Sequence, residues 1–393
     1  MSKTKKNRND ISRYPNGFSS YVTNVGVKNT EDDLVVVFSE AKCMASGVFT
    51  KSTLPGPAVR ISKENIKNKE AQALIVVSKN ANVATGLKGY QDANRIVEAI
   101  SSQLGIKKSL VQIAGTGVIG RRYPIEKIMQ GLSSLRQKLV KSDFFKVANG
   151  IRTTDKSPKM HSKKIGKIVL TGVAKGVGMI EPNMATLLAY FFTDAEIDKD
   201  DLDRIFKKVM NKTFNCMSID TDTSTSDSAV IFANGLSGRV NLLEFEEALY
   251  EIAFELMVDI LKDGEGSSKV MEVNISNAKS YLQARTIGKS IINSPLVKTA
   301  IHGADPNWGR IIMAIGKCTG ETGLSEDKIQ IRICDFEVYP KQLDEKDLSK
   351  LKKLMEKDFV GINVALNTGK EKATVWGCDL TCEYVRFNSA YTT

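Results

Sequence analysis

The feature that most limits how this chain can fold is a wholly apolar run that follows a rigid turn near the middle of the sequence. The run, residues 187–192 (LLAYFF), has the pattern of a buried strand, although a buried helix gives the same pattern. The turn before it contains Gly178 and Pro182; glycine permits backbone angles that other residues avoid, and proline fixes one. Thr186 stands between the two. Such a junction would hold a nucleophilic hydroxyl still, but an ordinary loop-to-strand connection fits it equally.

Strand-like and helix-like patterns alternate along the whole chain. Apolar runs predict strands at residues 34–38, 73–78, 110–114, 168–171 and 228–233. Apolar residues at helical spacing predict helices at residues 92–104, 123–140, 198–210 and 242–261. After about residue 293 the alternation resumes, with a strand at 329–333, a helix at 345–357 and a strand at 373–377. The sequence therefore predicts a mixed α/β protein with a smaller C-terminal α/β region.

Composition places the chain among soluble globular proteins. Its 393 residues, 42% hydrophobic and 26% charged, can bury a large core and suggest about two domains. No apolar stretch is long enough to span a bilayer, and the basic residues 1–12 read as a flexible tail without the apolar region of a secretory signal. The six cysteines form no Cys-x-x-Cys pair. We therefore expect no disulfide framework, no zinc site and a cytoplasmic location.

The net charge of +11 raises the question of nucleic acid as a partner. The basic residues are interleaved with acidic ones, and no alternation of basic and aromatic residues suggests a platform for stacking bases. A lysine-rich solvated surface explains the charge, so we expect neither a nucleic acid nor a membrane partner.

Two motifs suggest a cofactor or a metal, and each fails at a required position. The string 115–120 (GTGVIG) matches the dinucleotide fingerprint, but the acidic residue required about 20 positions later is replaced by the helix-like segment 135–139. The segment that begins at Asp220 resembles a calcium loop, but Thr225 stands where glycine is needed and Ile231 where glutamate is needed. We expect no cofactor, no metal, and a hydrogen-bonded turn at 220–227.

A set of short motifs occurs along the chain in a fixed order. They are 80–86 (NANVATG), 115–120 (GTGVIG), 153–155 (TTD), 175–186 (KGVGMIEPNMAT), 220–227 (DTDTSTSD), 263–266 (DGEG), 293–299 (NSPLVKT), 303–310 (GADPNWGR) and 388–393 (NSAYTT). In these motifs the chain resembles the ornithine acetyltransferase family, the glutamate N-acetyltransferases of arginine biosynthesis. Each motif alone is weak, but the ordered set is highly specific.

The resemblance implies an N-terminal-nucleophile-like layered α/β sandwich made by self-cleavage of one chain. Cleavage between Ala185 and Thr186 would give an α chain, 1–185, and a β chain, 186–393. Residues 186–292 would complete the main sandwich, and residues 293–393 would form the smaller region. Family members usually assemble as α2β2 heterotetramers.

The histidine count agrees with an N-terminal nucleophile. The chain has two histidines, His161 and His302, and neither sits in a sequence context that marks it as a catalytic base. Cleavage before Thr186 would supply a base instead, because an α-amino group has a pKa of about 7.7 to 8.0. By resemblance, Thr116 and Gly117 form the oxyanion hole for the reaction of Thr186.

The remaining site residues also follow from the resemblance. Lys175 matches a substrate-contacting lysine and suits a carboxylate, and Glu265 matches a glutamate that suits an amine. Thr153, Asn388 and Thr393 match the other substrate contacts. Without the family, Glu265 would be read as part of a helix-ending turn and the last two as a frayed terminus.

The expected function is transfer of an acetyl group from N-acetylornithine to glutamate through acetyl-Thr186. Acetyl-CoA is an alternative donor in some family members. Details of the motifs resemble members found beside secondary-metabolite genes, so the resemblance leaves open whether the physiological amine is ornithine. One rival function is an aminopeptidase or amidase that uses the same self-cleaved threonine and passes the acyl group to water. The other is an uncleaved, non-catalytic binding module.

Overall fold

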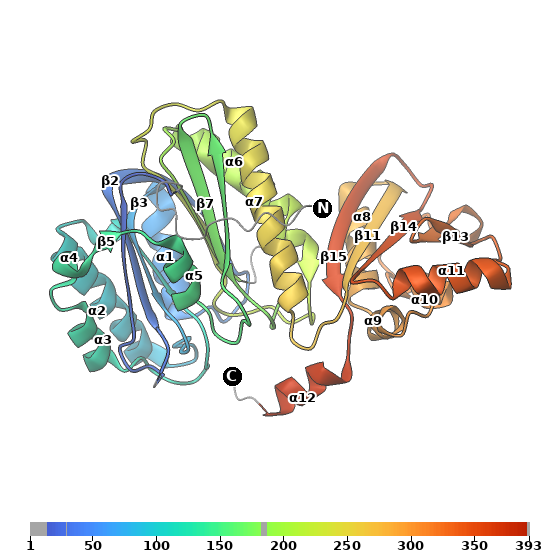
Figure 1. The fold of residues 1–393 in the computed structure, drawn as a ribbon, viewed down its shortest axis with the longest axis horizontal. Coiled ribbons are helices and arrows are strands. Elements are labelled where there is room, and N and C mark those ends of the chain that lie inside the picture. The colour runs from blue at the N-terminus through green and yellow to red at the C-terminus, as the bar shows by residue number, and fades with distance from the viewer. Residues whose placement is uncertain (1–13, 29, 182–186, 391–393) are drawn as a thin grey trace.

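A computed structural model describes residues 14–28, 30–181 and 187–390 of the chain. Its elements form two parts that lie side by side, with the helix α12 (Cys382–Ala390) projecting below them (Figure 1). The larger part contains a nine-stranded sheet and the smaller part a six-stranded sheet. The predicted mixed α/β class and its smaller C-terminal region are therefore confirmed.

The first sheet has the strand order β4-β3-β2-β10-β8-β7-β6, with β1 pairing with β2 and β5. Its strands are β1 (Phe18–Thr23), β2 (Leu34–Phe49), β3 (Glu70–Val77), β4 (Val111–Gly115), β5 (Val140–Lys141), β6 (Lys159–Ile165), β7 (Ile168–Lys175), β8 (Leu188–Thr193) and β10 (Ser228–Ala233). Most of the apolar run 187–192 lies in β8, all of whose residues are buried. It lies parallel to β10, with Leu188 opposite Ser228. The strand interpretation of this run is confirmed, because the run is too short for a core helix and has a partner on each side.

Helices cover this sheet on both faces. The helices α1 (Pro57–Asn65) and α2 (Gly86–Leu104) pack against β4, and α3 (Ile125–Leu132) and α4 (Leu135–Lys138) pack against α2. The helix α5 (Phe144–Gly150) contacts β1 and β2 as well as β6 and β7. The helices α6 (Lys199–Lys212) and α7 (Leu242–Asp263) complete this part. Around α5, the rings of Phe18, Phe144 and Phe192 pack within 4.8–6.3 Å of one another.

The second sheet has the order β13-β12-β14-β11-β15-β9. Its strands are β9 (Met217–Ser218), β11 (Val270–Ala278), β12 (Gln330–Ile333), β13 (Phe336–Tyr339), β14 (Phe359–Ala365) and β15 (Glu371–Cys378), and its helices are α8 (Tyr281–Ile292), α9 (Pro295–His302), α10 (Trp308–Gly316) and α11 (Glu345–Met355). Short 3-10 turns lie at Ile66–Asn68, Lys108–Leu110, Phe214–Cys216 and Glu326–Lys328.

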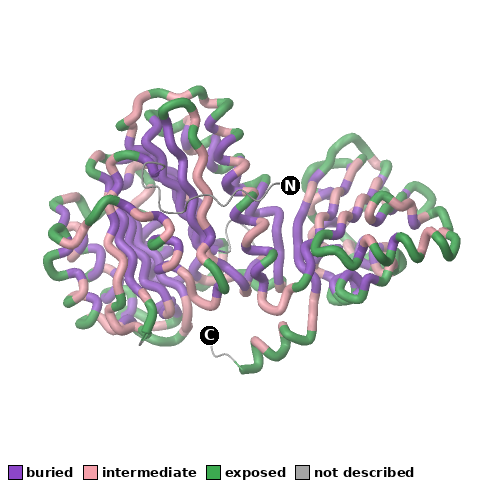
Figure 2. The backbone as a smooth tube through the Cα atoms, viewed as in Figure 1, coloured by how far each residue is buried: buried purple, intermediate pink, exposed green. Residues whose placement is uncertain are grey.

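The two parts share one core. The strand β9 comes from the chain between α6 and β10 but pairs with β15 of the second sheet, with Met217 opposite Trp376. One buried cluster runs from Phe191 on the first sheet through Ile252 on α7 to Val273 on the second sheet. Buried residues therefore continue from one part into the other across α7 (Figure 2).

Some predicted elements differ in extent from those observed. The second sheet includes β9 and β11, and α8 packs against it, so the smaller part also uses residues before 293, where the sequence pattern placed its start. The predicted helix 123–140 is wrong as one helix: it breaks at Ser133 and Ser134, and the left-handed Ser134 separates α3 from α4. Serine favours such breaks because its hydroxyl bonds nearby backbone groups; that of Ser133 donates to the Gln130 carbonyl.

Candidate active site

A cavity of about 270 Å³ lies where the ends of β4 and β7 meet the starts of β8 and β10, next to α12. The sequence singled out six described residues as site residues, and all six line this cavity. They are Thr116, Gly117, Thr153, Lys175, Glu265 and Asn388. Ala185, Thr186 and Thr393 lie outside the described residues, but Leu187, the next described residue after Thr186, also lines the cavity.

The end of β4 shapes one wall of the cavity. The Thr116 backbone N–H donates to the Val77 carbonyl at 3.1 Å. The side-chain hydroxyl is therefore the hydrogen-bond donor that Thr116 can offer to a ligand in the cavity. Gly117 has φ +120°, and a Cβ there would overlap the backbone of Lys79. Only glycine fits this close approach without strain. The two proposed oxyanion-hole residues are therefore held against the strand β3 and the residues after it.

Lys175, the last residue of β7, carries the positive charge of the cavity. Its Nζ lies 3.4 Å from the Thr153 hydroxyl oxygen. Burial lowers the pKa of the Lys175 ammonium, and the carboxylates of Asp155 and Asp227 oppose that shift. A buried ammonium with no direct carboxylate contact among the described residues attracts an anionic group of a ligand.

Behind Lys175 lies a buried ionic network that fixes the shape of the wall. Asp155 accepts hydrogen bonds from Lys159 Nζ at 2.7 Å and from the Gly176 N–H at 2.8 Å. Lys159 also reaches Asp263 at 2.6 Å. Burial by itself would raise the pKa of Asp155, but Lys159 and Lys175 overcome it and hold the pKa below its usual value. The network joins β6, the end of β7 and the end of α7.

Glu265, just beyond the end of α7, lines the same cavity as Lys175. Its N–H donates to the Val177 carbonyl at 2.8 Å, and its Oε2 accepts from Asn388 Nδ2 at 3.0 Å. A Cβ at Gly178 would overlap the Glu265 carboxylate. Burial raises the pKa of Glu265 above its usual value, and the Asn388 hydrogen bond partly opposes this. An ammonium group of a ligand would satisfy this carboxylate.

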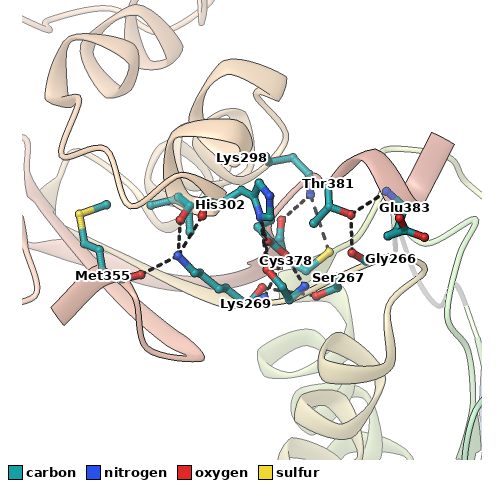
Figure 3. Close-up of polar contacts among 12 residues, drawn as sticks. Gly266, Ser267, Lys269, Lys298, His302, Met355, Cys378, Thr381 and Glu383 are labelled. Atoms are coloured by element: carbon teal, nitrogen blue, oxygen red, sulfur yellow. Dashed lines mark hydrogen bonds and ion pairs between the residues drawn. The ribbon is translucent and has the colours of Figure 1, made fainter. Parts of the chain in front are cut away.

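The helix α12 lies next to the cavity because its first residues, and the residues just before it, are bound to the segment around Gly266. The Thr381 hydroxyl donates to the Gly266 carbonyl at 2.6 Å (Figure 3). Gly266 has φ +68°, and a Cβ there would overlap the Tyr384 backbone. Asp379 accepts from the N–H groups of Ser268 and Lys269 at 2.8 and 3.0 Å. These contacts bring Asn388, 123 residues along the chain, to Glu265.

Two buried lysines, Lys269 and Lys298, bind carbonyl groups near the base of α12. Lys269 Nζ donates to three carbonyls, those of Ile301, His302 and Met355, at 2.8–3.0 Å (Figure 3). Lys298 Nζ donates to the carbonyls of Cys378 and Ile219 at 2.6 and 2.8 Å. Each buried ammonium thus ties together segments that are distant in sequence.

Neither histidine lines the cavity. His161 contacts Glu255 and Asp259 on α7 through its two ring nitrogens, at 2.8 and 2.7 Å. His302 Nδ1 faces both Ser268 and Asp379. A catalytic triad needs the serine and the aspartate on opposite ring nitrogens, so this group is structural.

The cavity residues that sequence reasoning did not assign to the site include Asp220, Asp227 and Tyr384. Asp220 accepts from the N–H groups of Met179 and Ile180 at 2.6 and 2.8 Å. Asp227 is buried, its Oδ2 has no hydrogen-bond partner among the described residues, and burial raises its pKa well above the usual value. Burial also raises the pKa of Tyr384 to about 12, so its hydroxyl remains a donor. The acid-rich motif 220–227 was the available signal for the first two.

The loop 220–227 is the hydrogen-bonded turn that we expected. The Asp222 N–H donates to the Asp220 carboxylate at 3.3 Å, and the Ser226 N–H donates to the Ser224 hydroxyl at 3.2 Å. Within the described ranges, no group of three or more His, Cys, Asp or Glu residues could hold a metal ion. The same ranges contain no helix long and apolar enough to cross a membrane.

The structure thus combines a layered α/β fold with a polar cavity that is lined by hydroxyl, lysine and carboxylate groups and by neither histidine. A model of the ArgJ family matches residues 19–393. The chain therefore belongs to the ArgJ family, which confirms the resemblance seen in its motifs.

The relatives cover almost the whole chain. The chain is 53% identical to arginine biosynthesis bifunctional protein ArgJ 2 of a Nostoc species, over 96% of this chain and 98% of that one. It is 46% identical to glutamate N-acetyltransferase Oat2 of Streptomyces clavuligerus, with the same coverage. A crystal structure of ArgJ from Bacillus halodurans is 38% identical, with a TM-score of 0.47, and covers 50% of this chain and 96% of that one.

Proposed function

We propose that this chain is a self-cleaving glutamate N-acetyltransferase that takes acetyl from N-acetylornithine. The observation that carries the proposal is the cavity itself, which holds Thr116 and Gly117, Lys175 and Glu265 around the start of β8. The names of the 46–53% identical relatives support the same activity. Small charged amino acids fit a cavity of about 270 Å³ lined by one lysine and several carboxylates.

Maturation would come first. The Thr186 hydroxyl attacks the Ala185 carbonyl, the C–N bond breaks, and the Ala185 acyl group moves to the Thr186 oxygen as an ester, while the hydroxyl proton passes to the nitrogen and frees the α-amine. Water then hydrolyses the ester and releases a carboxylate on Ala185. The Thr186 α-amine becomes the general base that the two histidines do not supply.

Acetyl transfer then proceeds in two half-reactions. The Thr186 α-amine takes the hydroxyl proton as the oxygen attacks the acetyl carbonyl, and the Thr116 hydroxyl and Gly117 N–H stabilise the oxyanion. The C–N bond breaks, ornithine leaves with the proton, and acetyl-Thr186 remains. The α-amine of glutamate attacks this ester and leaves as N-acetylglutamate, restoring the threonine. No cofactor is needed.

In this proposal Lys175 binds the α-carboxylate that both substrates share, with the Thr153 hydroxyl beside it. Glu265 binds the side-chain ammonium of ornithine, and Asn388 and Thr393 complete that end of the site. An α2β2 assembly, a cytoplasmic location and the use of acetyl-CoA as an alternative donor belong to the same proposal.

The test is the intact mass of the purified protein, with N-terminal sequencing of its fragments. We expect two pieces that meet at Ala185 and Thr186, and N-acetylornithine consumption that depends on glutamate. A single chain of 43.2 kDa would overturn the proposal. Consumption at the same rate without glutamate would instead favour the hydrolase.

A further inference from the structure

Glu181 is the last described residue before the predicted cleavage bond, and it is bound on both its main chain and its side chain. Its N–H donates to the Asp222 carbonyl at 3.0 Å, and its carbonyl accepts from the Thr223 hydroxyl at 3.2 Å. Its carboxylate contacts Lys289 Nζ at 3.2 Å and Asn293 Nδ2 at 3.2 Å. The main chain is therefore held by the turn 220–227, and the side chain by α8 of the second sheet.

The two side chains that bind the Glu181 carboxylate come from the C-terminal end of α8. Lys289 lies in the last turn of α8, and Asn293, which follows the helix with helical backbone angles, is four residues further on, so the two side chains lie on one side of the helix end. The Lys289 side chain is 12% exposed, and its Nζ also donates to the Met217 carbonyl on β9. Burial lowers the pKa of Lys289, and Glu181 is the carboxylate that opposes the shift. Removing either member would leave the other partly buried without its counter-charge.

The far end of the cleavage segment is held by the first sheet. The Leu187 carbonyl accepts from the Ser228 N–H at 3.0 Å, and β8 continues from there in register with β10. The chain that carries the predicted cleavage bond thus departs from a residue anchored to the second sheet and returns at a residue anchored to the first.

We infer that Glu181, Lys289 and Asn293 form an anchor that positions the chain for self-cleavage and takes no part in acetyl transfer. The inference rests on the proposed function. Attack within one chain is fast when the reacting atoms are held in a narrow range of geometries. Releasing one end of the segment that carries the cleavage bond would widen that range. After cleavage, Glu181 belongs to the α chain and Thr186 to the β chain, so the anchor no longer bears on the nucleophile.

The test compares Lys289→Met with a matched variant, Lys269→Met. Lys269 is also a buried lysine that binds carbonyls of the second part, but it makes no contact with Glu181. Freshly synthesised chains would be followed by gel and mass spectrometry for conversion into two pieces. We expect K289M to slow conversion ~10-fold or more and K269M to convert at the wild-type rate, while kcat per cleaved chain of K289M stays within about twofold of wild type.

The variant Glu181→Gln tests the same contact independently, because it changes the carboxylate and leaves Lys289 in place. We expect E181Q to slow conversion as K289M does, and the double variant to be no slower than either single one, because all three remove one interaction. Wild-type conversion in K289M and E181Q, or equal slowing in K269M, would overturn the anchor. A wild-type chain that stays intact would instead overturn the proposed function.

Discussion

The cavity has two walls that are held in different ways. The sheet wall, made of Thr116, Gly117 and Lys175, stands at the ends of buried strands of the first sheet. The helix wall, made of Tyr384 and Asn388, stands on α12, none of whose described residues is buried. In the proposed function, the oxyanion donors stand on the sheet wall, and the contacts with the variable end of the substrate involve a helix that is attached through its base.

The largest effect should come from the network behind the sheet wall. Lys159→Met would leave Asp155 and Asp263 buried without their counter-charge, and the free energy of unfolding should fall by about 3–5 kcal/mol. Urea denaturation measures this. The control is Lys207→Met, which removes an ion pair of the half-exposed Lys207 with Asp203 and should cost about 0–1 kcal/mol. Equal losses would mean that the network does not brace the wall.

The next effect concerns the proposed oxyanion donor on the sheet wall. Thr116→Ala removes the hydroxyl and should lower kcat per cleaved chain by a factor of ~10²–10³, while Tm changes little. Thr116→Ser keeps the donor and should remain within about tenfold of wild type. If T116A and T116S had equal rates, the hydroxyl would have no role at the oxyanion.

Replacing Glu265 should affect the reactions of the two substrates to different extents. N-acetylornithine brings a cation to the end of the cavity and glutamate an anion, so a carboxylate helps one and opposes the other. Glu265→Gln should slow exchange of labelled ornithine with N-acetylornithine by ~10-fold or more, and slow exchange of labelled glutamate with N-acetylglutamate less. Equal loss in both exchanges would contradict this role.

The pH dependence of the two exchanges should differ in the same sense. The pKa of Glu265 is raised, so its charge is present at high pH and is lost on acidification earlier than for an ordinary glutamate. Ornithine exchange should therefore fall relative to glutamate exchange as the pH drops from neutral. In E265Q the ratio should not vary with pH over that range, and a ratio that varied as in the wild type would assign the titration to another group.

The smallest effect should come from the helix wall. Asn388→Ala removes the hydrogen bond to Glu265 and should raise KM for N-acetylornithine roughly threefold to tenfold, as expected for one hydrogen bond to a charged group. Neither kcat nor Tm should change much. Ser389→Ala, which removes an exposed contact on the same helix, is the control. A large fall in Tm for N388A would show that α12 is a structural element instead.

The local sequence pattern predicted the buried strands well, because a short apolar run must be buried between neighbouring elements wherever it lies in the fold. The strand β8 and the helix α7 follow directly from their apolar residues. Pattern failed at Ser133 and Ser134, where backbone competition broke a helix, and at β2, which extends from the predicted residues 34–38 to Leu34–Phe49. The second half of β2, residues 44–49, forms a strand because β10 pairs with it, and that pairing is invisible in the local sequence.

The sequence by itself determined the family, the order of the motifs and the residue types that the proposed chemistry requires. Only the tertiary structure decided which groups are neighbours: Asn388 with Glu265, Lys159 with Asp263, and Glu181 with Lys289. The physical reason is that local pattern reflects the burial of each segment, whereas these contacts depend on how segments a hundred or more residues apart pack around one shared core.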